Sequence, residues 1–524
     1  MQVSWLSNQF GCKNKVWCIK MSEKFYITTA IPYINAPPHM GHALEFVLVD
    51  TIARYQKLKG KDVFLTTGTD ENSLKTVQAA NKAGVAPQVL SDKYSSSFRE
   101  FADKIGLNYD AFIRTSDKDA HWDGVVKLWD LCYKSGDIYK KSYEGLYCVG
   151  CEAFYTKDEL VNGLCPEHLT KPEIISEENY FFKLSKYEQE IKNLIKTDKL
   201  KIIPESRKNE ILSFLDQGLD DLSISRSNKR AKGWGIPVPN DDSQMIYVWF
   251  DALSVYLTGV GFGRDEKKFK KLWPADMHVI GKGIFRFHAI YWPAILLSAG
   301  LELPKEILVH GYITSNGQKM SKSIGNIIDP IQILDKYGRN NVRFYLLHNI
   351  SVFEDGDFSE ADLIKTTNSE LVGNIGNFIH RTLTFIYKNF DGKVEAKDLD
   401  KSGKELLEKI DKMVDEIDKE LSELRIGSGL AKILAISAMG NKYFQDSKPW
   451  ELVVTNKNKC EGVLFVCANI CRTLSVLLEP FLPEASEKLS KYLNIEIKLF
   501  SDAKPLTDGV IKTNEPKALF QKIN

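Results

Sequence analysis

Two β-rich runs near the start of the chain flank a segment in which apolar residues recur at helical spacing. The runs cover residues 25–30 and 63–67, and the helical segment covers residues 43–59. A strand, a helix and a strand in this order are typical of a parallel sheet. Strand-like runs return at residues 245–250, 277–281 and 307–311. We expect these later runs to form the second half of the same sheet.

The pattern changes twice along the chain. Between residues 138 and 244 the alternation of strand and helix is lost, which indicates an insertion. Beyond residue 357, long amphipathic stretches such as 404–424 and 462–478 predict an all-α domain. The expected divisions are an N-terminal extension (1–23), the first half of a nucleotide-binding α/β domain (24–137), the insertion (138–244), the second half of the α/β domain (245–356), the helical domain (357–500) and a tail (501–524).

Composition narrows the class of protein. A chain of 524 residues should divide into roughly three or four packed units. Lys and Arg number 70 against 69 Asp and Glu, so a nucleic acid would have to bind local basic patches and not a general positive field. Nine cysteines are too few for a disulfide scaffold, and no uninterrupted apolar run reaches the length of a membrane span. We expect a cytoplasmic protein without a membrane partner.

The first twenty residues carry three lysines and no acidic residue, and they lack the long apolar core of a secretory signal. Met21 stands directly before the first strand, where it is typical of an alternative translation start. We interpret residues 1–20 as a dispensable extension, with an organelle transit peptide as the alternative.

Three cysteines and a histidine in the insertion have the spacing of a zinc site. Cys148 and Cys151 are followed, after thirteen residues, by Cys165 and His168. Three thiolates and one imidazole complete a tetrahedral Zn²⁺ shell and leave no position for water or substrate. The spacing therefore predicts one structural zinc ion. Unrelated core cysteines are a poor alternative because the segment is polar, and a redox Cys-x-x-Cys would not need the second pair.

The sequence His39-Met40-Gly41-His42 stands where the first strand passes into the first helix. Backbone N–H groups and the helix dipole favour phosphate at such an edge, two imidazoles can donate hydrogen bonds to its oxygens, and a glycine permits close approach. Taken alone, the four residues are a weak signal, and two surface histidines at a helix cap would be the default interpretation.

A basic motif at residues 317–323 follows the last strand of the sheet and contains Lys319 and Lys322. Two ammonium groups there would neutralise charge on a triphosphate as pyrophosphate departs, a transition-state contact worth roughly 2–4 kcal/mol. The alternative is a solvated basic loop. The order of the two motifs, each at the sheet end that its role requires, argues against that alternative.

These motifs resemble the His-Ile-Gly-His and Lys-Met-Ser-Lys-Ser signatures of class I aminoacyl-tRNA synthetases. The runs that resemble the methionyl-tRNA synthetase family are 31–35, 67–71, 221–226, 234–239 and 287–293. The resemblance covers nearly all of residues 24–485. It implies a Rossmann-like parallel sheet split by a zinc-bearing connective insertion and followed by an all-α anticodon-binding bundle. It also implies a ligase that uses ATP, with Mg²⁺, to form methionyl-adenylate and then charges initiator and elongator methionine tRNA.

The resemblance also implies roles for individual residues. Catalysis and ATP binding are expected to rest on positioning and charge stabilisation, without a covalent intermediate. The residues expected to be catalytic are His39, His42, Lys319 and Lys322, and Gly41 joins these four in ATP binding. Asp70 is expected to pair with the ammonium group of methionine. The residues expected to line the methionine pocket are Ile31, Tyr33, Trp249, Ala252, Leu253, Tyr256, Ile284, Phe287 and His288.

In the helical domain, the resemblance implies that Asn377, Arg381 and Trp450 read the anticodon by hydrogen bonds and base stacking. Read without the resemblance, Trp249, Tyr256 and Trp450 would be core aromatics. Cys460, Cys467 and Cys471 lie on one face of a predicted helix, and we expect them to be core residues and not metal ligands.

The chain departs from the family at a few positions. The family usually has His-Gly where this chain has Asn72-Ser73, Asp where it has Gly283, and often Pro where it has Leu253. A lost carboxylate at Gly283 leaves the details of nucleotide binding open. The lysines and histidines that handle phosphate remain, so we expect activity to persist.

Two other functions stay open as alternatives. A binding-only relative would hold RNA or methionine without catalysis, and the intact lysine motif argues against it. A class I synthetase for cysteine would be expected to coordinate its substrate thiol with a metal inside the pocket, whereas the predicted ligands here lie together in the insertion. After the helix expected to end at Leu493, residues 494–524 are too few for an added barrel domain of roughly 100 residues. We therefore expect a monomer.

Overall fold

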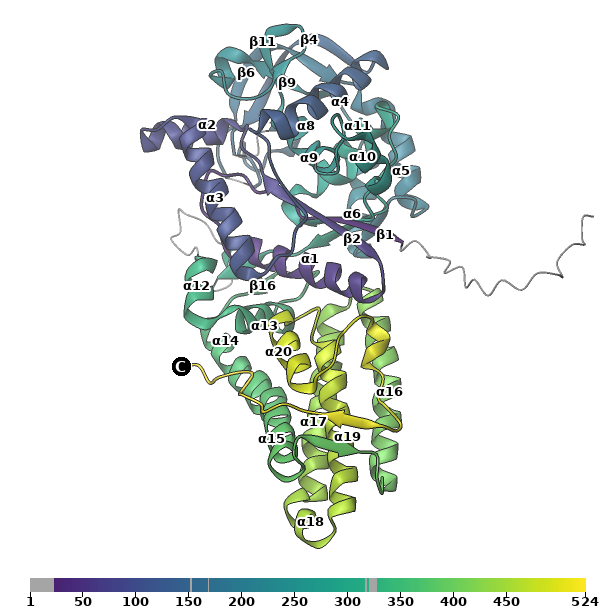
Figure 1. Cartoon of the computed structure of the whole chain (residues 1–524). Coiled ribbons are helices and arrows are strands. Elements are labelled where there is room, and N and C mark those ends of the chain that lie inside the picture. Colours follow the sequence, from purple (N-terminus) through teal and green to yellow (C-terminus); the bar gives the residue numbers. More distant parts are fainter. Residues whose placement is uncertain (1–22, 151–152, 168, 316–317, 320–327) are drawn as a thin grey trace, which may run out of the picture.

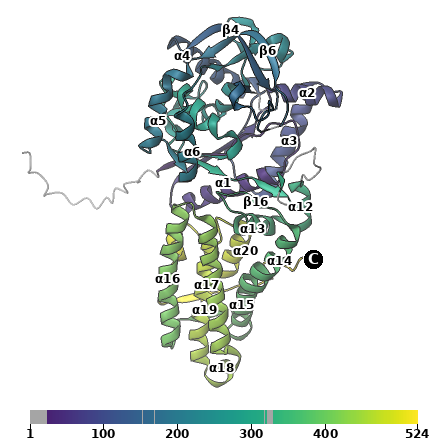
Figure 2. The same cartoon turned by 180° about the vertical axis from the view of Figure 1, so that it is seen from behind.

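A computed structural model gives the fold, and it describes residues 23–150, 153–167, 169–315, 318–319 and 328–524. At residues 143, 153–154 and 318–319 it describes the backbone alone. Figure 1 shows an α/β part above and a helical part, formed by the last third of the chain, below. The view from behind in Figure 2 shows helix α1 (Met40–Leu58) at the boundary between the two parts.

A six-stranded sheet, in which all neighbours are parallel, forms the centre of the α/β part. The strand order is β3-β2-β1-β12-β13-β7. The strands are β1 (Lys24–Thr28), β2 (Asp62–Thr69), β3 (Ala111–Arg114), β7 (Lys201–Ile203), β12 (Met277–Gly281) and β13 (Glu306–His310). The two predicted halves meet where β1 pairs with β12, with Ile27 opposite Met277. The predicted parallel sheet is therefore confirmed.

Successive side chains of β1 point to opposite faces of the sheet, and each face packs against its own hydrophobic core. Phe25 and Ile27 belong to the core that contains α1, while Tyr26 belongs to a second core on the opposite face. The α/β part also contains α2 (Leu74–Ala83), α3 (Pro87–Ile105), α4 (Asp123–Lys134), α8 (Val248–Leu253), α9 (Val255–Thr258), α10 (Glu266–Leu272) and α11 (Trp292–Ser298). Both faces of the sheet are thus covered, as a parallel sheet requires.

Two small antiparallel sheets form most of the insertion. Their strand orders are β5-β4-β6-β8 and β10-β11-β9. The strands are β4 (Ile138–Cys148), β5 (Ala153–Tyr155), β6 (Glu173–Phe182), β8 (Leu222–Ser223), β9 (Ser225–Ser227), β10 (Pro237–Val238) and β11 (Asp241–Ile246), and the helices are α5 (Glu188–Lys196), α6 (Glu205–Leu215) and α7 (Asn228–Ala231).

The structure differs from the sequence prediction at two places near the insertion. Residues 245–250 do not form a strand of the main sheet, because β11 pairs with β9 and the chain turns into α8 at Val248. A short, wholly buried apolar run fits a strand and a helix equally well, so periodicity could not separate them. The second difference is β7, which lies within the predicted insertion but pairs with β13 in the main sheet. Three residues are too few to show a strand pattern.

A small sheet connects the α/β part to the helical part. Its order is β15-β14-β16, with β14 (Ile313–Ser315), β15 (Gln318–Lys319) and β16 (Gly356–Asp357). Between its strands the chain forms α12 (Pro330–Tyr337) and α13 (Arg339–Asn349). Strand β14 follows β13 directly and packs against α1.

The helical part confirms the predicted all-α domain. Its helices are α14 (Glu360–Thr366), α15 (Asn377–Asn389), α16 (Lys401–Ser422), α17 (Ile426–Ser447), α18 (Pro449–Thr455), α19 (Lys457–Leu477) and α20 (Pro483–Leu493). Cys460, Cys467 and Cys471 are buried in α19, as expected. Among the described helices, α19 alone is long and apolar enough to cross a membrane, with a mean hydropathy of 1.5, but 89% of that window is buried inside the protein. It is the central helix of the bundle and contacts its neighbours on all sides.

The end of the chain packs on the helical part. Strand β18 (Val510–Lys512) pairs antiparallel with β17 (Lys393–Glu395). The side-chain amide of Asn368 donates a hydrogen bond to the Ile523 carbonyl (2.8 Å) and accepts one from its N–H (3.1 Å). Residues 510–523 therefore cover the region that leads into α15.

Candidate active site

Two histidines form a reciprocal cap at the start of α1, at the carboxyl edge of the sheet. Nδ1 of His39 accepts a hydrogen bond from the Gly41 N–H, and Nδ1 of His42 accepts one from the His39 N–H, each at 3.1 Å. The two rings stack with their centroids 3.9 Å apart. Because each Nδ1 is an acceptor, a neutral ring must carry its proton on Nε2. Both Nε2 atoms are therefore hydrogen-bond donors.

At neutral pH, His42 is a donor without a positive charge. Burial, and after it the neighbouring rings of His39 and His310, hold the pKa of His42 well below its usual value. Gly41 contributes through its small size, since a Cβ atom there would lie 2.9 Å from Cε1 of His39. A compact pair of donors at a helix N-terminus suits the oxygen atoms of a phosphate.

A buried pair behind these histidines escaped the sequence analysis. Glu45 of α1 accepts a hydrogen bond from the Ala30 N–H through Oε1 (2.8 Å), and its Oε2 lies 3.0 Å from Nε2 of His310. The contact fixes α1 against the end of β13, and so fixes the histidine cap relative to the sheet. The signal that could have found it is a carboxylate one helical turn after His42, on the same face.

The predicted lysine motif is described only in part. The backbone places Lys319 in β15, opposite Thr314 of β14. Because β14 packs against α1, this strand pair adjoins the helix that carries the histidine cap. Lys322 lies outside the described residues.

An aromatic cluster joins several residues of the predicted methionine pocket. The Trp249 ring stacks on Phe287 with centroids 3.7 Å apart, and Tyr33 meets Trp249 edge to face at 6.0 Å. The same apolar core includes Leu253, Tyr256 and Ile284. Nε1 of Trp249 is buried and has no hydrogen-bond partner among the described residues. The wall therefore holds one donor that a ligand could use.

Asp70 lies at the edge of this cluster. Its N–H donates to the Pro32 carbonyl (2.9 Å), and its own carbonyl accepts from the Ile34 N–H (3.2 Å), so Asp70 and Tyr33 form a backbone bridge. Asp70 is only 2% exposed. A nearly buried carboxyl group beside an aromatic wall is suited to an ammonium group on an apolar stem. Ile31 precedes the bridge and is half-buried, and Ala252 is buried on α8.

Tyr256 and His288 form a hydrogen-bonded pair in the same core. The His288 Nδ1–H donates to the Ile284 carbonyl (2.9 Å), so its Nε2 accepts from the Tyr256 hydroxyl (2.7 Å). Burial lowers the pKa of His288 to about 4, although the bond to Ile284 opposes this, and burial raises the pKa of Tyr256. Both groups are neutral at pH 7. Because its proton is committed to His288, the Tyr256 oxygen faces other groups as an acceptor.

The space at Gly283 is filled by a neighbouring ring. A Cβ atom on Gly283 would lie 2.1 Å from the hydroxyl oxygen of Tyr312. Lys282, the preceding residue, has its ammonium group 4.5 Å from the centroid of the Tyr312 ring and pairs with Asp355 at 2.7 Å. The Tyr312 hydroxyl therefore fills the space into which a side chain at residue 283 would extend.

Two of the four predicted zinc ligands are described. Cys148 and Cys165 are buried and form no disulfide, although the segment around them is largely exposed. Both adjoin Thr170, since Sγ of Cys148 lies 3.9 Å from Thr170 Oγ1 and the Cys165 N–H donates to the Thr170 carbonyl (2.9 Å). Cys151 and His168 lie outside the described residues. Within the described ranges no group of three potential metal ligands occurs.

The three predicted anticodon residues lie on neighbouring helices of the bundle. Asn377 of α15 donates to the Asn441 side chain (3.3 Å), and Arg381, one turn later, donates to Gln445 (3.0 Å). The Arg381 guanidinium lies 4.4 Å from the centroid of Phe444, whose ring is 6.4 Å from that of Trp450. Trp450 is 41% exposed, which excludes the alternative of a core aromatic. α18, which carries it, lies at the tip of the bundle (Figure 1).

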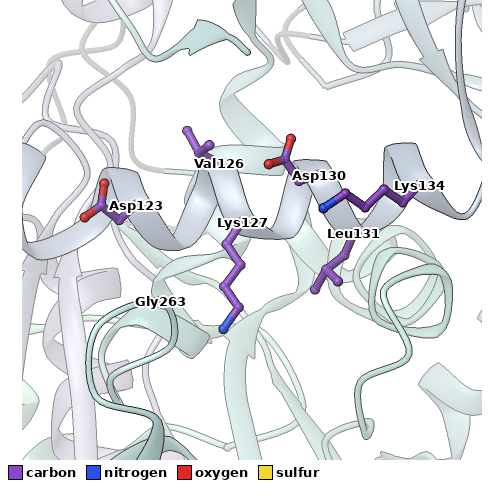
Figure 3. A pocket seen from close by; sticks show the side chains of 7 residues that line it. All are labelled: Asp123, Val126, Lys127, Asp130, Leu131, Lys134 and Gly263. Atoms are coloured by element: carbon purple, nitrogen blue, oxygen red, sulfur yellow. The ribbon is translucent and has the colours of Figure 1, made fainter.

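Two surface hollows lie outside these sites. Figure 3 shows one of about 420 Å³ beside α4, lined by Asp123, Val126, Lys127, Asp130, Leu131, Lys134 and Gly263. The other, of about 250 Å³, is lined by Glu210, Ile211, Ser213, Phe214, Gln217 and Arg286. The first carries acidic and basic side chains in equal number along one helix, so its lining favours no class of ligand.

Comparison with known proteins gives consistent results. A sequence model described as tRNA synthetases class I (M) matches residues 25–171 and 168–383. A second, described as the anticodon binding domain of methionyl tRNA ligase, matches residues 394–524. The methionine–tRNA ligase of Brucella suis biovar 1 is 39% identical over 497 residues, which are 93% of this chain and 96% of that protein. That of Clostridium acetobutylicum is also 39% identical, over 96% of this chain and 79% of its own length.

Solved structures agree with the sequence relatives. Mycobacterium tuberculosis methionyl-tRNA synthetase in complex with methionyl-adenylate has a TM-score of 0.90 and 37% identity, over 95% of this chain and 99% of that chain. The apo form of the same enzyme has a TM-score of 0.84 and 34% identity, over 96% of this chain and 99% of that chain.

Proposed function

The chain belongs to the methionyl-tRNA synthetase family of class I ligases, and from that premise we propose how its residues divide the reaction. The enzyme activates methionine with ATP and transfers it to methionine tRNA. In the first step a methionine carboxylate oxygen attacks the α-phosphorus of ATP. The bond to pyrophosphate breaks, and pyrophosphate leaves with its electron pair. ATP enters as its Mg²⁺ complex.

The proposal for ATP rests on the tautomers of the histidine cap. Because the Nδ1 atoms of His39 and His42 accept backbone hydrogen bonds, both rings carry their proton on Nε2, and these N–H groups are the proposed donors to phosphate oxygens. Gly41 keeps the rings close, and Lys319 and Lys322 supply positive charge as pyrophosphate forms. These groups stabilise charge and position ATP, and none is consumed in the step.

For methionine, we assign the ammonium group to Asp70 and the side chain to the aromatic cluster. A thioether is a weak acceptor on a flexible apolar stem, so selection has to rest mainly on shape. The stacked pair Trp249 and Phe287 and the neutral pair Tyr256 and His288 support this assignment. The remaining proposed wall residues are Ile31, Tyr33, Ala252, Leu253 and Ile284.

Zinc and tRNA complete the proposal. The two described thiols, buried in a polar segment and anchored at Thr170, fit a structural zinc ion held by Cys148, Cys151, Cys165 and His168. The metal would cross-link the insertion and supply no reaction chemistry. Asn377 and Arg381 are proposed to bind base edges of the anticodon, with Trp450 as the exposed stacking surface.

We also propose a cytoplasmic monomer. None of the described cysteines forms a disulfide, which suits a reducing compartment. The exposed large apolar side chains are spread over the α/β part, the insertion and the bundle, for example Tyr133 on α4, Ile174 on β6 and Val454 on α18. Light scattering at micromolar concentration should give the mass of one chain, and a mass twice as large would contradict the monomer.

ATP–pyrophosphate exchange, run with each of the twenty amino acids in turn, tests the assignment as a whole. We expect exchange with methionine alone, followed by charging of methionine tRNA. Exchange with cysteine would favour the alternative synthetase, and binding of methionine without exchange would favour the binding-only relative.

A further inference from the structure

Asn72 connects the two sides of the proposed methionine site. Its Nδ2 group donates to the Thr115 carbonyl (2.9 Å) and to Oδ2 of Asp251 (2.9 Å). Both partners are acceptors, so the orientation of the amide follows from them. Asn72 is 7% exposed, and Asp251 is buried in α8 between Trp249 and Ala252. The bond therefore ties the loop that carries Asp70 to the helix that carries the aromatic wall.

The acceptor side of this bond is itself held in place. Oδ1 of Asp251 lies 2.7 Å from Nε2 of His121, whose Nδ1 lies 2.8 Å from the Thr258 hydroxyl. All three side chains are buried. Because His121 holds the other oxygen of the Asp251 carboxylate, that carboxylate keeps a fixed position. The hydrogen bond from Asn72 therefore fixes the distance between the Asp70 loop and α8.

The loop around Asn72 is fixed on its other side as well. Glu71 forms a two-pronged pair with Arg114 (2.8 and 2.9 Å), and its N–H donates to Thr115 Oγ1 (2.8 Å). Its carbonyl accepts from Nε1 of Trp234 (2.8 Å). These contacts hold the loop to β3 and to the insertion, but none of them reaches α8. The bond from Asn72 to Asp251 links this loop directly to the pocket helix.

We propose that Asn72 is a positioning residue for methionine, which sets the place of the Asp70 carboxyl group relative to the Trp249 wall. The proposal rests on the assignment of Asp70 to the ammonium group. If the bond to Asp251 is removed, the side-chain pocket stays formed, but the carboxyl group is no longer held at the correct distance from it. The loss should then appear only for ligands that carry an ammonium group.

The test compares two ligands on the whole chain by calorimetry. L-Methionine carries the ammonium group, and 4-(methylthio)butanoate is the same molecule without it. For Asn72→Ala we expect methionine to bind about tenfold more weakly, while the affinity for the analogue stays within about twofold. Asp70→Asn serves as the reference for loss of the ammonium contact. Asn72→Ser retains one donor, so its affinity for methionine should lie between those of the wild type and Asn72→Ala. The serine variant provides the same test if the alanine variant does not fold.

Asn469→Ala is the matched control. Asn469 is likewise a buried amide with two hydrogen bonds, both to Leu506 at 2.9 Å, but it lies in α19 of the helical part. Its loss should lower stability without changing the ratio of the two affinities. Two results would overturn the role of Asn72 alone. In the first, Asn72→Ala weakens the binding of both ligands equally. In the second, Asn72→Ala changes neither affinity, while Asp70→Asn loses the preference for methionine over the analogue. An unchanged preference in Asp70→Asn would overturn the assignment of Asp70, and the role of Asn72 with it.

Discussion

Arg343 of α13 and Asp50 of α1 form a completely buried ion pair, with Nη2 of the arginine 2.8 Å from Oδ2 of the aspartate. The same guanidinium donates to the carbonyls of Phe481, Pro480 and Ile105. The aspartate also accepts from Nε of Arg54 at 2.7 Å. The middle of α1 is therefore tied to the turn that joins α19 and α20, across the boundary between the two parts of the protein.

Replacing Arg343 should destabilise the whole protein. Arg343→Met keeps the apolar stem but removes the buried arginine partner of Asp50 and the donor of three buried carbonyls, so the free energy of unfolding should fall by about 3–5 kcal/mol. Urea denaturation measures this. Lys442→Met is the control, because its pair with Asp446 is largely exposed and its loss should leave stability close to wild type. A small effect of Arg343→Met would show that the pair adds little net stability.

Substitutions of His42 can separate the roles of its two ring nitrogens. Asn reproduces the Nδ1 acceptor that caps α1, and Gln reproduces a donor at the position of Nε2. We expect His42→Asn to keep the stability of the protein but to lose about 100-fold in the rate of pyrophosphate exchange. His42→Gln should retain more activity but lose about 1 kcal/mol of stability with the cap. The reverse order of activities would place the essential function in the cap and not in the donor.

His288 should make stability depend on pH. Its pKa of about 4 in the folded state lies below the ordinary value of 6.5, so the unfolded chain takes up this proton first as pH falls. The contribution of His288 to the free energy of unfolding is constant above pH 6.5, and it decreases as pH falls from 6.5 to 4. In His288→Gln the decrease over this range should be smaller by about 3 kcal/mol. Denaturant titrations at several pH values measure the difference, and parallel curves for the two proteins would contradict it.

Trp450→Ala should separate the two steps of the reaction. Adenylate formation should stay intact, while charging of methionine tRNA should lose about 1–3 kcal/mol of tRNA binding, the contribution of one base stacked on an aromatic ring. Tyr387→Ala is the control, since Tyr387 is an aromatic residue of α15 with 42% exposure, close to that of Trp450. Equal losses in both variants would indicate a general sensitivity of the bundle.

Cys165→Ser should remove the proposed zinc ion. Wild-type protein is expected to contain one zinc per chain, and the variant none, with faster proteolysis of residues 138–182 as local order is lost. Cys132→Ala provides the control, because Cys132 is a buried thiol of α4 outside the predicted ligand set. Metal analysis that finds no zinc in the wild type, or two ions, would contradict the site.

The sequence predicted the central strands well because their patterns are local. The runs at 63–67 and 277–281 are rich in β-branched residues and lie within or coincide with β2 and β12. The turn into α8 could not be predicted in this way. Trp249 and Phe250 favour a strand by composition, and their helical state follows from tertiary contacts such as the stack of Trp249 on Phe287.

The candidate site shows the same limit. The histidine cap is a local motif and could be placed at the start of a helix from sequence. The pair of Glu45 and His310 joins positions 265 residues apart, and the bond of Asn72 to Asp251 joins positions 179 apart. Such partners become visible only when the topology brings β13 and α8 next to the first half of the sheet.

Helix α1 limits how far this protein can be treated as a set of modules. Beyond the histidine cap, Arg54 pairs with Glu479, and the hydroxyl of Tyr55 donates to Asp418 at 2.8 Å. A fragment cut near residue 357 would keep every residue proposed to contact ATP and methionine, yet it would expose a charged and apolar strip along the helix that orients His42. If the anticodon bundle is exchanged for that of a relative, the new bundle must therefore match this strip of α1. This requirement holds whichever anticodon the new bundle reads.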